Sequence, residues 1–145
     1  MGRLPGSVLF ACNYNSVRSP MAAALLRQLH GRRVFVDSVG VRAMPIDPFV
    51  LAVMAELGID LRGHAPKTFI ELEDTSFDLV ISLTPEAQHR AVELTRTTAC
   101  EVEFWPSFDP TSIEGSREEI LATYRSVRDA LLRRIRERFP DPPVG

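Results

Sequence analysis

Short runs of apolar residues alternate along the chain with longer segments in which apolar residues recur every three or four positions. A short apolar run is typical of a buried strand, and the wider spacing is typical of a helix that buries one face. The runs predict strands over residues 7–11, 34–36, 77–83 and 102–105. Helical patterns separate these strands, so the order along the chain is strand, helix, strand.

Each predicted helix is preceded by a residue whose side chain can cap the first backbone N–H groups. The caps and their helices are Ser19 for residues 20–30, Asp47 for 48–57, Thr84 for 85–94 and Ser116 for 117–139. Proline follows the first three caps and suits the first helical turn. Glu119 completes a capping box with Ser116 in the fourth.

Strands that alternate with helices predict a parallel sheet with helices on both faces. Four strands in 145 residues indicate a small, doubly wound α/β fold of the flavodoxin-like kind, in a single domain over residues 1–139. Residues 67–73 are expected to form a further short helix, and the proline-rich tail 140–145 is expected to be disordered. Ligands of such folds bind where the strands end, so chemistry is expected directly after the strands.

Composition narrows the range of functions. The net charge of -2 provides no basic field for nucleic acid, and no apolar run approaches the roughly 20 residues of a membrane span. The last helix is rich in arginine but also carries acidic residues, which indicates a solvated face with i,i+4 ion pairs. Two cysteines make neither a disulfide framework nor a zinc site. We therefore expect a cytoplasmic protein with no nucleic-acid or membrane partner.

The loop after the first strand combines a cysteine with groups that bind anions. Cys12 ends the strand, and Arg18 lies six residues later, next to the start of a helix. Backbone N–H groups at a helix start bind phosphate-sized anions, and an arginine fork holds two anion oxygens. The same positive surroundings favour the Cys12 thiolate, to which Ser19 could also donate. A nucleophile and an oxyanion site are thus predicted in one loop; the alternative is a structural cysteine beside a solvated arginine.

Asp109 is the candidate proton donor for this site. It follows the fourth strand, so it lies at the same edge of the sheet as Cys12. Asp109-Pro110 is explained neither as a helix cap nor as part of the tail, although an ordinary turn would also account for it.

Cys12, Arg18 and the Ser19-Pro20 pair that follows resemble the signature of the low-molecular-weight protein tyrosine phosphatases and of arsenate reductases with the same fold. The resemblance continues through residues 37–40, 58–64, 77–80 and 109–110. It implies hydrolysis of a phosphorylated protein or small aryl phosphate through a phosphocysteine on Cys12, with Asp109 as general acid. It implies no metal and no organic cofactor. It also implies that Ser38 and His64 hold Asn15 and so support the loop. The phosphate-binding loop then consists of Asn13, Tyr14, Asn15, Ser16, Val17, Arg18 and Ser19.

The sequence departs from the family pattern at several points. Tyr14 stands where these phosphatases usually have glycine, and Val17 stands where many have a second cysteine. Residues 40–46 contain no aromatic side chain to stack on a substrate ring, and Thr111 and Ser112 follow the Asp-Pro pair where tyrosine is frequent.

Two other functions stay open. An arsenate reductase that uses an external thiol is the enzymatic alternative, because arsenate has the shape and charge of phosphate. A binding module that senses anions is the non-enzymatic one. Cys100 is placed at the start of the fourth strand, roughly 15–20 Å from Cys12, too far for a disulfide. Its expected role is buried packing.

Overall fold

The computed structural model describes residues 4–72 and 76–141. Within them, parallel strands form one sheet in the order β2-β1-β3-β4. The strands are β1 (Ser7–Cys12), β2 (Phe35–Gly40), β3 (Leu79–Ser82) and β4 (Glu101–Phe104). The predicted parallel α/β sheet is confirmed, and its order places the switch point between β1 and β3.

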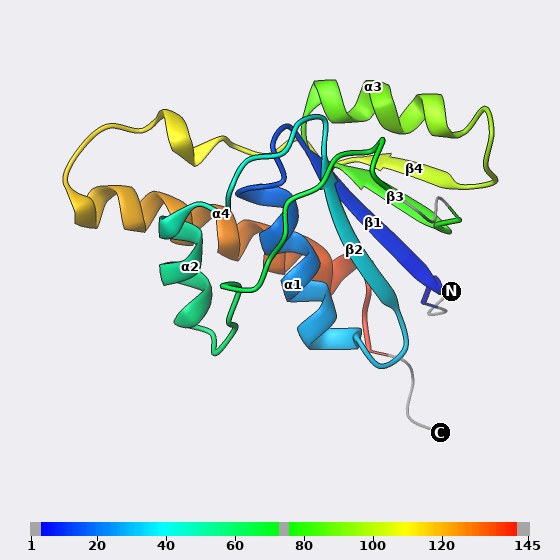
Figure 1. Cartoon of the computed structure of the whole chain (residues 1–145). Coiled ribbons are helices and arrows are strands. Elements are labelled where there is room, and N and C mark those ends of the chain that lie inside the picture. The colour runs from blue at the N-terminus through cyan, green and yellow to red at the C-terminus, as the bar shows by residue number, and fades with distance from the viewer. Residues whose placement is uncertain (1–3, 73–75, 142–145) are drawn as a thin grey trace.

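Helices cover both faces of this sheet, as predicted (Figure 1). They are α1 (Arg18–His30), α2 (Pro48–Ala55), α3 (Pro85–Leu94) and α4 (Arg117–Arg138), with a 3-10 turn, η1 (Pro110–Ser112), before α4. The helices α1 and α4 pack together on one face, with α2 against α4, and α3 covers the other face. No helix of the described residues is long and apolar enough to cross a membrane.

Strand β1 lies at the centre of the core because its side chains alternate between two apolar layers. Val8 and Phe10 point to the layer of α1 and α4, whereas Leu9 and Ala11 point to the layer of α3. All four side chains are fully buried. This accounts for the unbroken apolar run, since both faces of the strand are covered.

Three of the predicted helix caps are confirmed. Asp47 accepts from the Phe49 N–H, Thr84 accepts from the Ala87 N–H, and Ser116 forms its capping box. The Ser19 cap is wrong: α1 begins at Arg18, and no side chain caps it. The Ser19 hydroxyl is instead occupied within the loop described below.

The predicted helix over residues 67–73 is also wrong for the part that is described. Thr68 forms an isolated parallel bridge with Gly40, and a turn follows it. The Gly40 N–H donates to the Lys67 carbonyl, and the Phe69 N–H donates to the Gly40 carbonyl. Residues 67–69 therefore run beside the end of β2 and pair with it there. Residue 73 lies outside the described residues, as do residues 142–145 of the predicted tail.

The arginines of α4 form different ion pairs from those expected. Arg125 and Arg128 both bind Glu56 just after α2, and Arg138 binds Glu103 of β4. Arg128 is buried and also donates to the Val53 carbonyl. These bonds join α4 to other elements rather than linking successive turns of the helix.

Candidate active site

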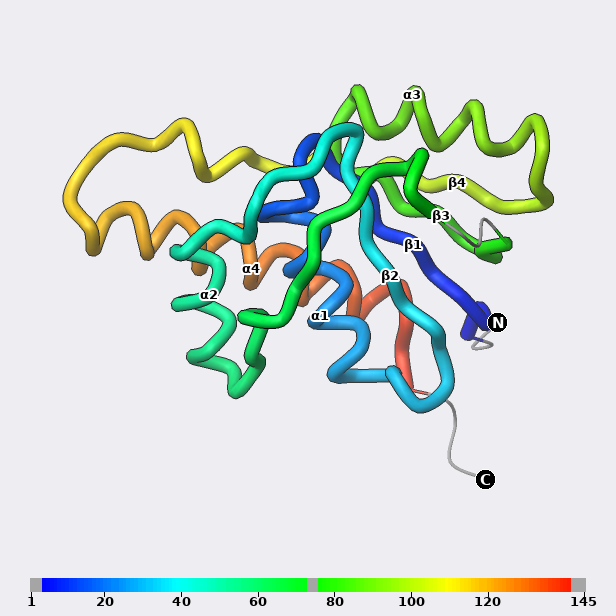
Figure 2. Tube along the Cα trace, in the orientation of Figure 1, coloured from blue at the N-terminus to red at the C-terminus, as the bar shows by residue number. Residues whose placement is uncertain are grey.

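The loop after β1 lies at the switch point of the sheet. Residues 13–17 lead from the end of β1 directly into α1. Figure 2 shows that the segments after β2 and β4 turn over the same end of the sheet. The predicted position of the site at the carboxyl ends of the strands therefore holds for this loop.

The carbonyl groups of this loop are held from outside it. Backbone N–H groups of residues 41, 42, 44 and 47 donate to the carbonyls of residues 12, 13, 14 and 16, at 2.8–3.1 Å. His64 Nε2 lies 2.9 Å from the Asn15 carbonyl, and the Val17 carbonyl accepts from the Met21 N–H of α1. The segment after β2 thus fixes the loop mainly through main-chain bonds.

The backbone N–H groups of residues 13–18 are unpaired within the described part of the chain, in contrast to the carbonyl groups of the loop. None of these N–H groups donates to an acceptor among the described residues. Successive unpaired N–H groups at the start of a helix form an anion-binding site, and the dipole of α1 adds to it. The backbone of the loop therefore has the polarity that a phosphate-like anion requires.

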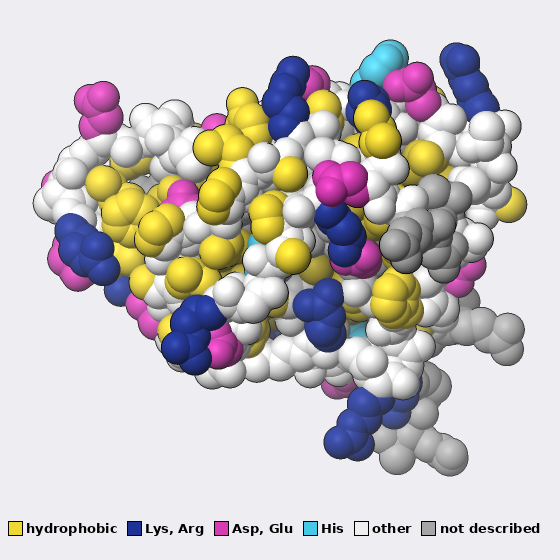
Figure 3. Space-filling view, viewed as in Figure 1, with side chains coloured by type: hydrophobic (Ala, Val, Ile, Leu, Met, Phe, Trp, Pro, Cys, Tyr) yellow, Lys and Arg dark blue, Asp and Glu magenta, His cyan; other side chains and the backbone are white. Residues whose placement is uncertain are grey.

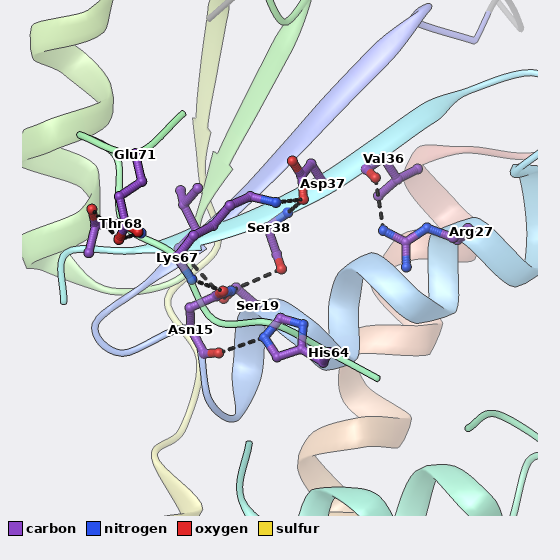
Figure 4. Close-up of polar contacts among 11 residues, drawn as sticks. Asn15, Ser19, Arg27, Val36, Asp37, Ser38, His64, Lys67, Thr68 and Glu71 are labelled. Carbon is purple, nitrogen blue, oxygen red and sulfur yellow. Dashed lines mark hydrogen bonds and ion pairs between the residues drawn. The ribbon is translucent and has the colours of Figure 1, made fainter. Parts of the chain in front are cut away.

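Asn15 is the central side chain of the support. It is fully buried, and with φ of 54° it is the sole non-glycine residue with positive φ among the described residues. Its Nδ2 donates to the hydroxyls of Ser19 and Ser38 at 2.9 Å, and its Oδ1 accepts from the Lys67 N–H at 3.0 Å. Figure 4 shows these bonds together with the one between His64 and the Asn15 carbonyl. The structure thus brings Ser38 and His64 to Asn15.

His64 is half-buried, and this burial lowers its pKa. The charges of Lys67 and Arg27 lower the pKa further, against the opposing effect of the Asn15 carbonyl. The neutral ring therefore predominates at neutral pH, with its Nε2–H donating to Asn15.

Tyr14 fits in the loop at the position where the related phosphatases usually have glycine, because its backbone does not adopt the positive φ that favours glycine. Gly40 lies against the loop instead: a Cβ there would lie 2.6 Å from Asn15 N and 2.8 Å from the Tyr14 carbonyl carbon. The close backbone approach is therefore provided by a glycine on β2.

Cys12 is buried at the base of the loop, and it is a free cysteine. Its Sγ lies 2.9 Å from Ser19 Oγ, which also lies 3.2 Å from the Val39 carbonyl oxygen. Because the hydroxyl carries one proton, Ser19 donates either to the sulfur or to Val39. A Cys12 thiolate would accept this hydrogen bond from Ser19, whereas a Cys12 thiol can donate to Ser19 Oγ.

Arg18 connects the loop to the segment that carries Asp109. The Arg18 side chain is buried, and its Nη1 donates to the Ser107 carbonyl at 2.9 Å. Asp109 lies two residues further on, and its Oδ1 accepts from the N–H and the hydroxyl of Thr111. Asp109 therefore caps the 3-10 turn η1, a local role that the sequence analysis did not assign to it. Desolvation opposes ionisation of Asp109, but the Thr111 bonds and the charge of Arg18 outweigh it and lower its pKa.

A support from α4 was missed by the sequence analysis. The Tyr124 hydroxyl donates to Asp47 Oδ2 at 2.7 Å, while the Asp47 N–H holds the Ser16 carbonyl. Burial, this bond and the charges of Asp47 and Asp109 raise the Tyr124 pKa above its ordinary value. Asp47 is recognisable in the sequence as a cap, but nothing there pairs it with a residue 77 positions away.

Thr84 has a second role that the sequence did not indicate. Besides capping α3, its hydroxyl donates to Asn13 Oδ1 at 2.7 Å. Tyr14 is the large side chain of the loop that faces solvent, and it is 43% exposed. On the face seen in Figure 3, hydrophobic side chains gather between α2 and the segment that leads into α4. Among the described residues, no group of three His, Cys, Asp or Glu side chains could hold a metal ion.

Known proteins share both the sequence pattern and this architecture. An arsenate reductase of Halalkalibacterium halodurans is 31% identical over 131 residues, which cover 89% of this chain and 91% of that protein. The solved YwlE arginine phosphatase of Geobacillus stearothermophilus superimposes with a TM-score of 0.70 at 26% identity, covering 90% of this chain and 88% of the other. An arsenate reductase solved in the phosphate binding state gives a TM-score of 0.71 at 26% identity, covering 92% and 95%.

The family model for low molecular weight phosphotyrosine protein phosphatases matches residues 7–139. The match runs from the first residue of β1 to the end of α4, so it includes the loop, its supports and the Asp109 segment. This chain therefore belongs to the low molecular weight phosphotyrosine protein phosphatase family.

Proposed function

We propose that this chain hydrolyses phosphate monoesters through a phosphocysteine on Cys12. The observation that carries the proposal is the row of unpaired N–H groups at residues 13–18, beside the Cys12 sulfur and the Arg18 guanidinium. Such a row binds the equatorial oxygens of a phosphoryl group, and the sulfur attacks phosphorus in line. The substrates are phosphorylated proteins or small aryl phosphates.

Asp109 is the proton donor and then the base. In the first step the S–P bond forms and the P–O bond to the leaving group breaks, while the Asp109 carboxyl protonates that oxygen. In the second step the Asp109 carboxylate takes a proton from water, the water oxygen attacks phosphorus, and the S–P bond breaks. The products are inorganic phosphate and the Cys12 thiolate, which accepts a hydrogen bond from the Ser19 hydroxyl.

Asp109 must be protonated when the substrate is bound, although its pKa is lowered in the free protein. A bound phosphate dianion places negative charge beside the carboxylate and raises its pKa by like-charge repulsion. The Thr111 bonds and Arg18 then favour the ionised form that the second step requires.

Reduction of arsenate is the second candidate, favoured by the names of the similar proteins. Arsenate to arsenite takes two electrons, so two thiols must become one disulfide. Cys12 would provide one thiol and a small external thiol the other.

Cys100 is excluded as that second thiol by the strand register. It lies level with Ser7 on β1, five residues from Cys12 and two strands away. At about 3.3 Å per residue and about 4.8 Å per strand, the separation is on the order of 19 Å. Cys100 is only half-buried, not buried as expected, but its distance from Cys12 agrees with the prediction.

One pair of assays tests these candidates. Turnover of para-nitrophenyl phosphate is measured beside arsenate-dependent oxidation of a small thiol, with Cys12→Ser as the inactive variant and Cys100→Ala as its matched control. We expect phosphatase turnover that Cys12→Ser abolishes and Cys100→Ala leaves intact, while Cys12→Ser still binds inorganic phosphate. Near-normal turnover by Cys12→Ser would refute the mechanism, and thiol oxidation without phosphatase turnover would favour the reductase. Phosphotyrosine and phosphoarginine, tested side by side, then define the substrate class.

A further inference from the structure

A cavity of about 610 Å³ lies between α4 and the segment that carries Asp109. This segment runs alongside α4 in Figure 1. None of residues 12–19 lines the cavity, so it is separate from the anion-binding loop. Its volume falls within the roughly 300–1,000 Å³ of small-molecule sites.

The cavity exists because the exposed face of α4 carries small side chains here. Ala122, Ser126 and Ala130 follow one another at four-residue spacing, so they lie on one face of the helix, and all three line the cavity. Larger side chains at these positions would fill the space. The opposite wall is aromatic: it contains Trp105, which is 3% exposed, and Phe108, which is 57% exposed.

Arg134 provides the charge of this cavity. It is the charged residue of the lining, and its guanidinium lies 4.8 Å from the centre of the Trp105 ring. Arg133, Arg134 and Arg136 of this helix form no ion pair with any described residue, and Arg134 is the one of these three that lines the cavity. A flat apolar body with one negative group complements this arrangement.

We propose that this cavity binds a small aromatic anion, a carboxylate or sulfonate, with its rings between Phe108 and the small residues of α4 and its acidic group at Arg134, whose guanidinium lies over the Trp105 ring. A ligand in the cavity affects the anion-binding loop through Ser107. This residue lines the cavity, and its carbonyl accepts a hydrogen bond from Arg18 Nη1. A ligand that fixes Ser107 therefore fixes the position of the Arg18 guanidinium. Binding of the ligand does not depend on the proposed hydrolysis, whereas an effect of the ligand on turnover rests on that proposed function.

Trp105 is the single tryptophan of the chain, so it reports on the cavity directly. The probe is 8-anilinonaphthalene-1-sulfonate, titrated with excess inorganic phosphate present to occupy the anion-binding loop. We expect saturable energy transfer from Trp105 to the probe. Ser126→Leu fills the cavity and weakens the affinity by about tenfold or more, and Arg134→Gln weakens it severalfold. Arg133→Gln, which removes the neighbouring charge outside the lining, leaves the affinity unchanged.

Three results would overturn the proposal. One is a dissociation constant above about 1 mM for the wild type. Another is an affinity that neither Ser126→Leu nor Arg134→Gln changes. The third is a wild-type dimer, seen by sedimentation, that Ser126→Leu separates, because a second copy would then cover the cavity. In wild type the probe should alter para-nitrophenyl phosphate turnover, and in Ser126→Leu it should not. If the wild type shows no turnover at all, the proposed hydrolysis fails while the fluorescence titration still decides the ligand site.

Discussion

Tyr124 of α4 donates a 2.7 Å hydrogen bond to Asp47, whose own backbone N–H holds the carbonyl of Ser16 in the anion-binding loop. The same Asp47 side chain caps α2 through the Phe49 N–H. The loop, α2 and α4 therefore meet at one residue, Asp47. Loss of the Tyr124 hydroxyl should consequently affect both global stability and the loop.

Tyr124→Phe keeps the ring that packs 5.2 Å from Phe49 but removes the donor to Asp47. We expect the free energy of unfolding to fall by about 1–2 kcal/mol, because a partly buried carboxylate loses a partner. Urea unfolding measures this, and phosphate affinity should fall with it. Tyr14→Phe is the matched control, since Tyr14 is exposed and its hydroxyl bonds to no described residue. An equal loss in both variants would contradict the role of the Tyr124 bond.

Gly40→Ala should destabilise the protein by about 1–3 kcal/mol, as overpacking does. The new Cβ would meet Arg42 O at 2.3 Å and Asn15 N at 2.6 Å, and both are main-chain atoms that cannot move aside. Gly63→Ala is the control, because its Cβ would meet nothing within 4 Å. Thermal or urea unfolding checks the difference. Equal stabilities would show that the loop does not need this close approach.

Asp109→Asn should slow cleavage of phenyl phosphate by roughly 10²–10⁴-fold, because a poor leaving group requires a proton. The loss should shrink for leaving groups that depart as stable anions. In wild type, kcat should decline as pH rises and Asp109 loses its proton in the substrate complex, and the variant should lack this decline. Rates with a series of aryl phosphates across pH measure both effects. An unchanged rate with phenyl phosphate would remove Asp109 from the mechanism.

His64 should make stability depend on pH. Its pKa is lowered in the folded state, so the folded protein binds fewer protons than the unfolded chain between the folded pKa and the ordinary value of 6.5. The stabilisation from the neutral ring is therefore full above about pH 6.5 and is lost as pH falls through the folded-state pKa. His64→Gln, which retains a donor for the Asn15 carbonyl, should lose this dependence. Urea unfolding at several pH values tests it, and an identical pH profile in the variant would contradict it.

Elements stabilised by local chemistry were predictable from the sequence. The apolar run of β1 and the caps at Asp47, Thr84 and Ser116 depend on neighbours within a few residues, and the structure confirms them. Ser19 has the same local pattern, yet its hydroxyl binds Cys12 and Asn15 instead. Tertiary contacts override the capping preference there, because a buried polar network must be satisfied first.

The contacts of the candidate site were only partly predictable. The Cys12-to-Arg18 loop indicated a nucleophile beside an anion-binding backbone, and the family resemblance added Ser38 and His64, both of which the structure places at Asn15. The Lys67 N–H was missed, because a main-chain donor leaves no mark in the sequence.

The main-chain donors that hold the loop also determine which sequence changes this segment can tolerate during evolution. Residues 41, 42, 44 and 47 hold the loop with their backbone nitrogens. The exposed side chains of Arg42 and Met44 can therefore vary without breaking these bonds, whereas the Asp47 carboxylate is needed by Phe49 and Tyr124. Proline is the residue that these four positions exclude, and the proline of this segment, Pro45, occurs where no loop carbonyl is held. Selection can therefore alter the exposed rim at Arg42 and Met44 while the anion-binding frame is inherited intact. Single substitutions at this rim can thus change the surface beside the loop without removing the main-chain bonds that hold it.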